Sequence, residues 1–230
     1  MVNDGWKMPV GEALDGSQLV AFDLDGTLID SVPDLAAAVD AALLDVDLPV
    51  AGEARVRDWV GNGSWSLLER ALTDALGEAP SEVLCKTAHE RFLEHYHRHP
   101  CVHTRLYPGV ETALSQLFRR GLILCLVTNK PEAFIGPILE HLSIDGYFTV
   151  CLGGDTLPRK KPDPMPLRHL CQQFDVSPSQ CVMVGDSRHD IQAGKAAGYR
   201  TIAVPYGYNH GEPVSLSEPD LIVESLDQLV

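Results

Sequence analysis

The stretch that decides the fold is Leu19-Val20-Ala21-Phe22-Asp23-Leu24-Asp25-Gly26-Thr27. Its leading apolar residues, bounded by polar ones, are typical of a short strand buried in the core. The strand meets a polar loop at Asp23. We therefore expect a buried strand whose carboxyl end carries acidic side chains, which is the end at which open parallel sheets bind their ligands.

From residue 107 onward, apolar runs alternate with amphipathic segments. Strands are predicted at residues 122–127, 148–152, 181–184 and 201–204, and helices at 110–119, 132–141, 164–174 and 190–197. Such alternation is typical of parallel strands joined by right-handed crossovers. The predicted fold class is α/β, with a doubly wound, Rossmann-like parallel sheet formed by residues 19–30 and 107–230.

Residues 31–106 have the spacing of helices and show no strand pattern. The helices predicted there cover residues 34–46, 67–76 and 81–97, and the second of them ends at Gly77. This segment is therefore expected to form a helical domain inserted after the first strand. Residues 1–18 are polar and contain glycine, and we interpret them as an N-terminal extension.

The composition excludes several classes of function. The 230 residues include 18 basic and 32 acidic side chains, a formal net charge of −14. Such a chain repels nucleic acid backbones and anionic lipid, so we expect neither as a partner. The longest apolar run, Leu122–Val127, is too short to span a bilayer. None of the six cysteines forms a CxxC pair and the first residues lack an apolar signal core, which together favour the cytoplasm.

Polar side chains gather after three of the predicted strands. They are Asp23 and Asp25 after the first strand, Thr128 and Asn129 after the strand at 122–127, and Asp186 and Asp190 after the strand at 181–184. Carboxylates that share one cleft repel each other. A hard cation relieves the repulsion, and Asp oxygens suit Mg²⁺, which also recruits the oxygens of a substrate phosphate. The pattern favours a magnesium-dependent site for a phosphate compound.

A phosphate group also needs hydrogen-bond donors. Thr128 offers a hydroxyl, Asn129 an amide, and Lys161 a positive charge within a basic run that stands out in an acidic chain. An Asp can attack phosphorus directly, and a second carboxylate can then donate and accept the protons. Asp23 and Asp25, two positions apart, have this arrangement, although spacing alone leaves the chemistry open.

Four short motifs resemble those of the haloacid dehalogenase superfamily, in the same order along the chain. They are Asp23-Leu24-Asp25-Gly26-Thr27-Leu28, Thr128-Asn129, Lys161-Pro162, and Gly185-Asp186-Ser187 with Asp190. The helical insert resembles that superfamily's C1 cap. Longer stretches are similar to the bacterial phosphoglycolate phosphatases within it, namely Phe22–Ser31, Trp59–Gly63, Tyr107–Val110, Gly153–Pro158 and Tyr206–Asn209.

The resemblance implies a Mg²⁺-dependent phosphatase that hydrolyses 2-phosphoglycolate to glycolate and phosphate through an aspartyl-phosphate. Asp23 would be the nucleophile and, through its other oxygen, a metal ligand. Asp25 would be the general acid and base, with its backbone carbonyl on the metal. Asp186 would complete the protein's ligands to the Mg²⁺.

The resemblance also implies which residues hold the phosphoryl group, namely Thr128, Asn129 and Lys161. Asp190 would orient the metal shell or Lys161, and an equal alternative is that it caps a helix. The expected partner is a small phosphate ester, and the chain is expected to be a monomer or a homodimer.

The choice of substrate is expected to lie in the insert. Gly61-Asn62-Gly63 directly precedes the helix at 67–76, and free amides at a helix start attract anions. One hypothesis is that this helix start, with Arg70, meets the carboxylate of the substrate. The alternative is an ordinary turn, with Ser64 or Ser66 as the helix N-cap.

Other functions are also compatible with parts of the pattern. The runner-up is a sugar-phosphate phosphatase or an enzyme like β-phosphoglucomutase. A phospho-accepting module of the receiver type is a remote non-enzyme alternative, because a receiver is a single domain without a large insert. The histidines at positions 89, 95, 97, 99 and 103, together with Cys101, could bind zinc. Alternate residues of a helix face different sides, however, which favours a solvated helix end.

Overall fold

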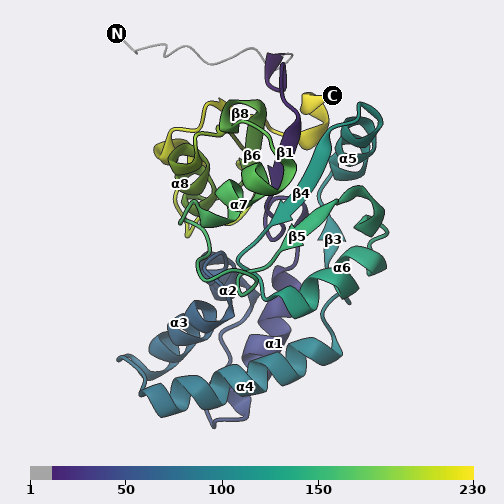
Figure 1. Ribbon diagram of the computed structural model, residues 1–230. Coiled ribbons are helices and arrows are strands. Elements are labelled where there is room, and N and C mark those ends of the chain that lie inside the picture. Colours follow the sequence, from purple (N-terminus) through teal and green to yellow (C-terminus); the bar gives the residue numbers. More distant parts are fainter. Residues whose placement is uncertain (1–11) are drawn as a thin grey trace.

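A six-stranded parallel sheet forms the centre of the structure, a computed structural model that describes residues 12–230 (Figure 1). Its strands, in spatial order, are β5 (Val150–Leu152), β4 (Ile123–Val127), β1 (Leu19–Phe22), β6 (Cys181–Gly185), β7 (Arg200–Ala203) and β8 (Leu221–Ile222). All neighbouring strands pair in parallel. The predicted doubly wound α/β sheet is confirmed, with β8 as an addition too short to give a sequence pattern.

Helices cover both faces of the sheet. They are α5 (Val110–Arg119), α6 (Ile135–His141), α7 (Met165–Phe174) and α8 (Arg188–Ala197). Strand β1 is buried on both faces, because Val20 and Phe22 pack into the cluster that includes α5 and α6, whereas Leu19 and Ala21 pack with α7. This explains why β1 has a continuous apolar run and no alternation.

The insert consists mainly of four helices, α1 (Val32–Leu44), α2 (Glu53–Trp59), α3 (Ser64–Leu76) and α4 (Glu82–Arg98), grouped at one end of the sheet (Figure 1). Helix α3 ends at Gly77 in the left-handed conformation, and the Ser81 hydroxyl accepts a hydrogen bond at the start of α4. Helix α2 was not predicted, because Val56 is its only buried residue and gives no helical period.

A two-stranded antiparallel ribbon lies where the chain leaves and re-enters the sheet domain. It pairs β2 (Ile29–Asp30) with β3 (Arg105–Leu106). Strand β3 lies within residues 31–106, so the prediction that this segment contains no strand was wrong. The strand gave no signal in the sequence because two residues are too few to show alternation. The buried Asp34 carboxylate, on α1, fixes the approach to β3 by accepting backbone hydrogen bonds from Val102, His103 and Thr104.

The structure describes the predicted N-terminal extension, residues 1–18, only from residue 12 onward, and residues 1–11 lie outside the described part. Ala13 is buried in the core, and the Arg200 guanidinium donates to its carbonyl oxygen over 2.6 Å. The end of the predicted extension thus packs on the sheet domain. Across the described residues, the helices all fall short of the length and apolar character needed to cross a membrane.

Candidate active site

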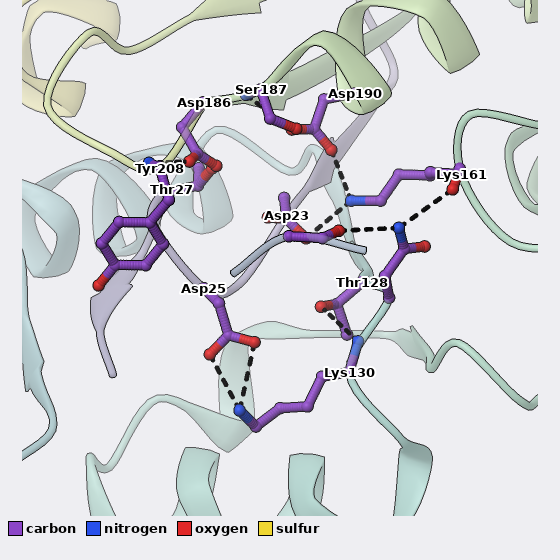
Figure 2. Close-up of polar contacts among 12 residues, drawn as sticks. Asp23, Asp25, Thr27, Thr128, Lys130, Lys161, Asp186, Ser187, Asp190 and Tyr208 are labelled. Carbon is purple, nitrogen blue, oxygen red and sulfur yellow. Dashed lines mark hydrogen bonds and ion pairs between the residues drawn. The ribbon is translucent and has the colours of Figure 1, made fainter. Parts of the chain in front are cut away.

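Three adjacent strands deliver the predicted polar residues to one edge of the sheet. Strand β1 lies between β4 and β6, and the residues that follow these strands are Asp23, Thr128 and Asp186. Because parallel strands end on the same side, side chains that lie 58 to 163 positions apart in sequence come together there. Figure 2 shows them converging from separate elements.

Lys161 ties two of these carboxylates together. Its ammonium group donates to Asp23 Oδ1 over 2.7 Å and to Asp190 Oδ1 over 2.6 Å, and all three side chains are buried (Figure 2). The second Asp190 oxygen accepts from the backbone and the hydroxyl of Ser187, which makes a capping box at the start of α8. Asp190 therefore combines both roles that the sequence left open, because it caps the helix and orients Lys161.

The acidic groups are held in an environment that disfavours their charge. Burial raises the pKa of Asp23 to about 6, although Lys161 opposes this, and Asp190 adds to the rise. Burial, Asp190 and Asp23 together raise the pKa of Asp186 well above its ordinary value. The hydroxyl of Thr27 donates to Asp186 over 2.8 Å and only partly offsets these effects.

This donor set fits a hard cation. Ligand oxygens of Asp23, Asp186 and Asp190 lie within 4.8 Å of one another, and all three residues are buried. All three carboxylates already accept hydrogen bonds, Asp190 from Lys161 and Ser187, Asp186 from Thr27 and the Tyr208 backbone, and Asp23 from Lys161. The choice of Asp23 and Asp186 as direct ligands is what the family resemblance implies. A bound Mg²⁺ would favour the ionised carboxylates that burial disfavours.

Asp25 faces a lysine that the sequence analysis missed. The Lys130 ammonium donates to Asp25 Oδ1 and Oδ2 over 3.0 and 3.2 Å, and the Ser31 hydroxyl donates to Oδ1. The Lys130 side chain is buried, with its nitrogen 4.8 Å from the centroid of the Tyr96 ring. Burial opposes the charge, but Asp25 and Tyr96 outweigh it and raise the pKa of Lys130.

Thr128 and Asn129 also lie at this edge. The Thr128 hydroxyl accepts from the backbone of Lys130 over 3.2 Å and keeps its proton for another acceptor. The side-chain amide of Asn129 donates to the carbonyl oxygens of Gly61 and Lys161, each over 3.0 Å. Asn129 thus joins the helical insert to the sheet domain, in addition to the phosphate-binding role predicted for it.

A cavity of about 40 Å³ lies between the insert and the sheet edge. Asp23, Asp25, Thr128, Asn129 and Lys130 line it from the sheet side, and the insert contributes Gly61, Gly63, Ser64 and apolar side chains. The predicted loop therefore lies at the site. The boundary between the insert and the sheet domain at this cavity is called the seam below. The Lys160 ammonium also bridges it, because it donates to the Asn62 carbonyl oxygen over 2.7 Å.

Two expectations for the insert require correction. Arg70 does not line the cavity, because its guanidinium donates to the Trp59 carbonyl oxygen over 2.6 Å. Neither Ser64 nor Ser66 is the N-cap of α3. The N-cap is Gly63, with φ of 90° and no side-chain bond, while the Ser64 hydroxyl bonds to His89 Nε2 over 2.8 Å.

The histidines of α4 point to different partners. His89 bonds to Ser64, the His95 ring bonds to Asp45 over 2.8 Å, and His97 packs against the Phe134 ring. Within residues 12–230, the side chains that lie close enough together to hold a metal ion are those of Asp23, Asp186 and Asp190, and no histidine of α4 belongs to this group. The divergence of these rings follows from helical geometry.

Residues 20–204 match the family model of the haloacid dehalogenase-like hydrolases. The chain belongs to this family. It is 47% identical over 214 residues to a phosphoglycolate phosphatase of Pseudomonas putida, in a match that covers 93% of this chain and 78% of the relative. A phosphoglycolate phosphatase of Escherichia coli is 46% identical over 227 residues, with coverages of 92% and 90%.

Solved structures agree with this assignment. The crystal structure of a predicted phosphoglycolate phosphatase from Haemophilus somnus superposes with a TM-score of 0.88 and is 39% identical, covering 94% of this chain and 97% of that one. The predicted superfamily and the predicted enzyme class, a phosphatase, are confirmed. The receiver-type alternative is excluded by the family match.

Proposed function

We propose that this enzyme hydrolyses 2-phosphoglycolate to glycolate and inorganic phosphate, with Asp23 as the nucleophile and Mg²⁺ as the cofactor. The observation that best supports this proposal is that the buried Asp23 is hydrogen-bonded to Lys161 and that both Asp23 and Asp25 line the same cavity. The names of the relatives in Pseudomonas putida and Escherichia coli supply the substrate. The same site would serve a sugar phosphate, so the substrate is the part that needs testing.

In the proposed first step, an Asp23 oxygen attacks phosphorus and the bond from phosphorus to the glycolate oxygen breaks. Asp25 donates a proton to the leaving oxygen, and Lys161 and Thr128 donate hydrogen bonds to the phosphoryl oxygens. In the second step, Asp25 takes a proton from a water molecule that attacks the phosphorus of the aspartyl-phosphate. Inorganic phosphate leaves, and Asp23 is restored.

Asp23, Asp186 and the backbone carbonyl of Asp25 would hold the Mg²⁺. Bound there, the cation would supply positive charge that offsets the charge of the phosphate oxygens. Closure of the insert over the cavity would exclude bulk water from the aspartyl-phosphate.

The proposed substrate is tested by steady-state hydrolysis of a panel of phosphate monoesters with Mg²⁺. The panel contains 2-phosphoglycolate and hexose phosphates, with pyrophosphate beside them. We expect the highest kcat/KM for 2-phosphoglycolate. A higher kcat/KM for a hexose phosphate would overturn the proposal and favour the sugar-phosphate alternative.

Mg²⁺ is expected to stabilise the folded protein more strongly as the pH rises. The pKa of Asp23 is about 6 in the metal-free fold, above its ordinary value, so ionising it costs folding free energy. The metal-free protein should therefore lose stability as the pH rises from about 4 to about 6. Below this range Mg²⁺ must displace a proton, whereas above it the cation relieves the full repulsion.

Thermal unfolding with and without Mg²⁺ measures this effect at a pH of about 5 and of about 8. One fixed Mg²⁺ concentration, about one hundred times the Kd of the parent at the higher pH, should add about 2.7 kcal/mol to the free energy of unfolding there and less at the lower pH, where protons compete with the cation. The Asp186→Ala variant, which lacks one carboxylate, should show a much smaller gain. An equal gain at both pH values, or in this variant, would contradict the proposed metal site.

Gly63→Leu is expected to hold the insert away from the sheet domain. Gly63 has φ of 90°, and a Cβ atom there would lie 2.7 Å from the Lys160 nitrogen and 3.1 Å from the Asn129 carbonyl oxygen. Because a displacement of about 1 Å can cost about 10²-fold in rate, kcat/KM should fall by about that factor for every ester.

Gly77→Leu is the matched control for this variant. Gly77 has φ of 74° at the other end of α3, and no atom lies within 4 Å of an added Cβ. The control should lose stability through the same backbone strain and keep its kcat/KM. Similar losses of activity in both variants would show that strain, and not the seam at Asn129, is responsible.

A further inference from the structure

The site contains two buried lysines, and they reach different carboxylates. Lys161 binds Asp23 and Asp190, at the position where the phosphoryl group would be transferred. Lys130 binds Asp25, and Figure 2 shows it approaching from the opposite end of the labelled group. The proposed mechanism uses Lys161 but gives Lys130 no task.

Lys130 is the one basic residue among the described residues that line the cavity. Opposite the polar edge, the walls are apolar and come from Leu67, Phe92, Tyr96 and Phe134. These side chains contribute no charge that could recognise an anionic group. The part of the substrate that lies beyond the phosphate would therefore meet a single fixed positive charge.

The position of Lys130 follows from that of Asp25. As the acid, Asp25 must lie against the ester oxygen that leaves, and Lys130 contacts both oxygens of Asp25 at 3.0 and 3.2 Å. In 2-phosphoglycolate, one carbon atom separates this ester oxygen from the carboxylate. A carboxylate so placed lies near any group that touches Asp25.

The Lys130 ammonium has capacity for a further acceptor. It carries three N–H donors, and the hydrogen bonds that it makes within residues 12–230 all go to Asp25. The Tyr96 ring, whose centroid lies 4.8 Å from the Lys130 nitrogen, also stabilises the cation. A charge-assisted hydrogen bond in so dry a site is stronger than one in water.

We propose that Lys130 binds the carboxylate of the substrate and so selects phosphate esters that carry an acid group one carbon from the ester oxygen. This inference rests on the proposed function. It assigns carboxylate recognition to a lysine of the sheet domain, whereas the sequence hypothesis assigned it to the loop at 61–63 and to Arg70. Arg70 is bonded instead to the Trp59 carbonyl oxygen.

The test compares two esters of the same length. In 2-hydroxyethyl phosphate, a neutral hydroxymethyl group replaces the carboxylate of 2-phosphoglycolate. The ratio of kcat/KM for the two esters is measured in the parent, in Lys130→Met and in Lys160→Met. The last is a matched control, because Lys160 is a half-buried lysine at the same seam that does not line the cavity.

Lys130→Met should lower the preference for 2-phosphoglycolate by about 10- to 100-fold, the worth of a charge-assisted hydrogen bond. Lys160→Met should leave the ratio unchanged, since any effect on closure acts on both esters. Any misplacement of Asp25 in Lys130→Met also slows both esters and cancels in the ratio. If Lys130→Met does not fold, Lys130→Gln removes the charge while keeping a donor toward Asp25, and the same fall is expected.

If kcat/KM falls by the same factor for both esters in the folded Lys130 variant, the inference is overturned and Lys130 is a positioning residue for Asp25. That outcome differs from a failure of the proposed function. If the parent enzyme itself shows no preference for 2-phosphoglycolate, the substrate assignment is at fault. If the parent prefers it and the Lys130 variant keeps the preference, only the inference fails.

Discussion

An Asp23→Asn variant is expected to fold like the parent and to lose at least about 10⁴-fold in kcat, as when a catalytic nucleophile is removed. The amide has nearly the shape of the carboxylate but cannot form the aspartyl-phosphate. Lys161 loses one partner and keeps Asp190, 2.6 Å away. Since burial raises the pKa of Asp23, removal of its charge relieves repulsion and should not destabilise the metal-free fold.

Turnover of 2-phosphoglycolate and thermal unfolding measure the two parts of this expectation. The variant's mass must be verified before the assay, because deamidation of the introduced asparagine would regenerate the parent residue. Substantial turnover by a folded and verified variant would show that Asp23 is not the nucleophile. Loss of the fold would instead mean that the carboxylate has a structural role.

Lys161→Met is expected to have the largest effect on stability. The lysine is 3% exposed and neutralises two buried carboxylates, so its removal leaves Asp23 and Asp190 uncompensated. Breaking a buried ion pair in this way costs about 3–5 kcal/mol of the free energy of unfolding. Activity should also fall by about 10²- to 10³-fold, because a donor to the phosphoryl group is lost.

Denaturant unfolding of metal-free protein measures the stability change, with Lys195→Met as the control. The Lys195 side chain is 43% exposed and donates to the Ser217 carbonyl oxygen, so its loss should cost less than about 0.5 kcal/mol. The deficit of Lys161→Met should shrink at acidic pH, because burial raises the pKa of Asp23 to about 6 and its protonation removes one of the uncompensated charges. A deficit no larger than that of the control would contradict the buried ion-pair account.

The sheet and its polar edge could be predicted because each rests on short-range patterns. The apolar runs of β1, β4 and β6 are continuous, so they predict buried parallel strands. Once those strands are parallel and adjacent, Asp23, Thr128 and Asp186 must meet. The family motifs then added chemical roles to residues that geometry had already grouped.

The parts that escaped prediction depend on how the insert meets the sheet domain. Lys130 follows Asn129 directly, yet its role emerges only when α4 brings Tyr96 over it and Asp25 faces it from the loop after β1. Arg70 lies on the helix expected to meet the substrate, but packing turns it toward Trp59. The start of α3 uses Gly63 instead of a serine cap because close approach to Asn129 leaves no space for a side chain.

The most direct test of the central claim is to locate the phosphoryl group on the protein. The Asp25→Asn variant is mixed rapidly with Mg²⁺ and isotopically labelled 2-phosphoglycolate, quenched with acid, digested and mapped by mass spectrometry. Loss of the group that activates water should slow the second step most, so labelled protein accumulates. We predict that the label resides on Asp23. A label on any other residue would contradict the account.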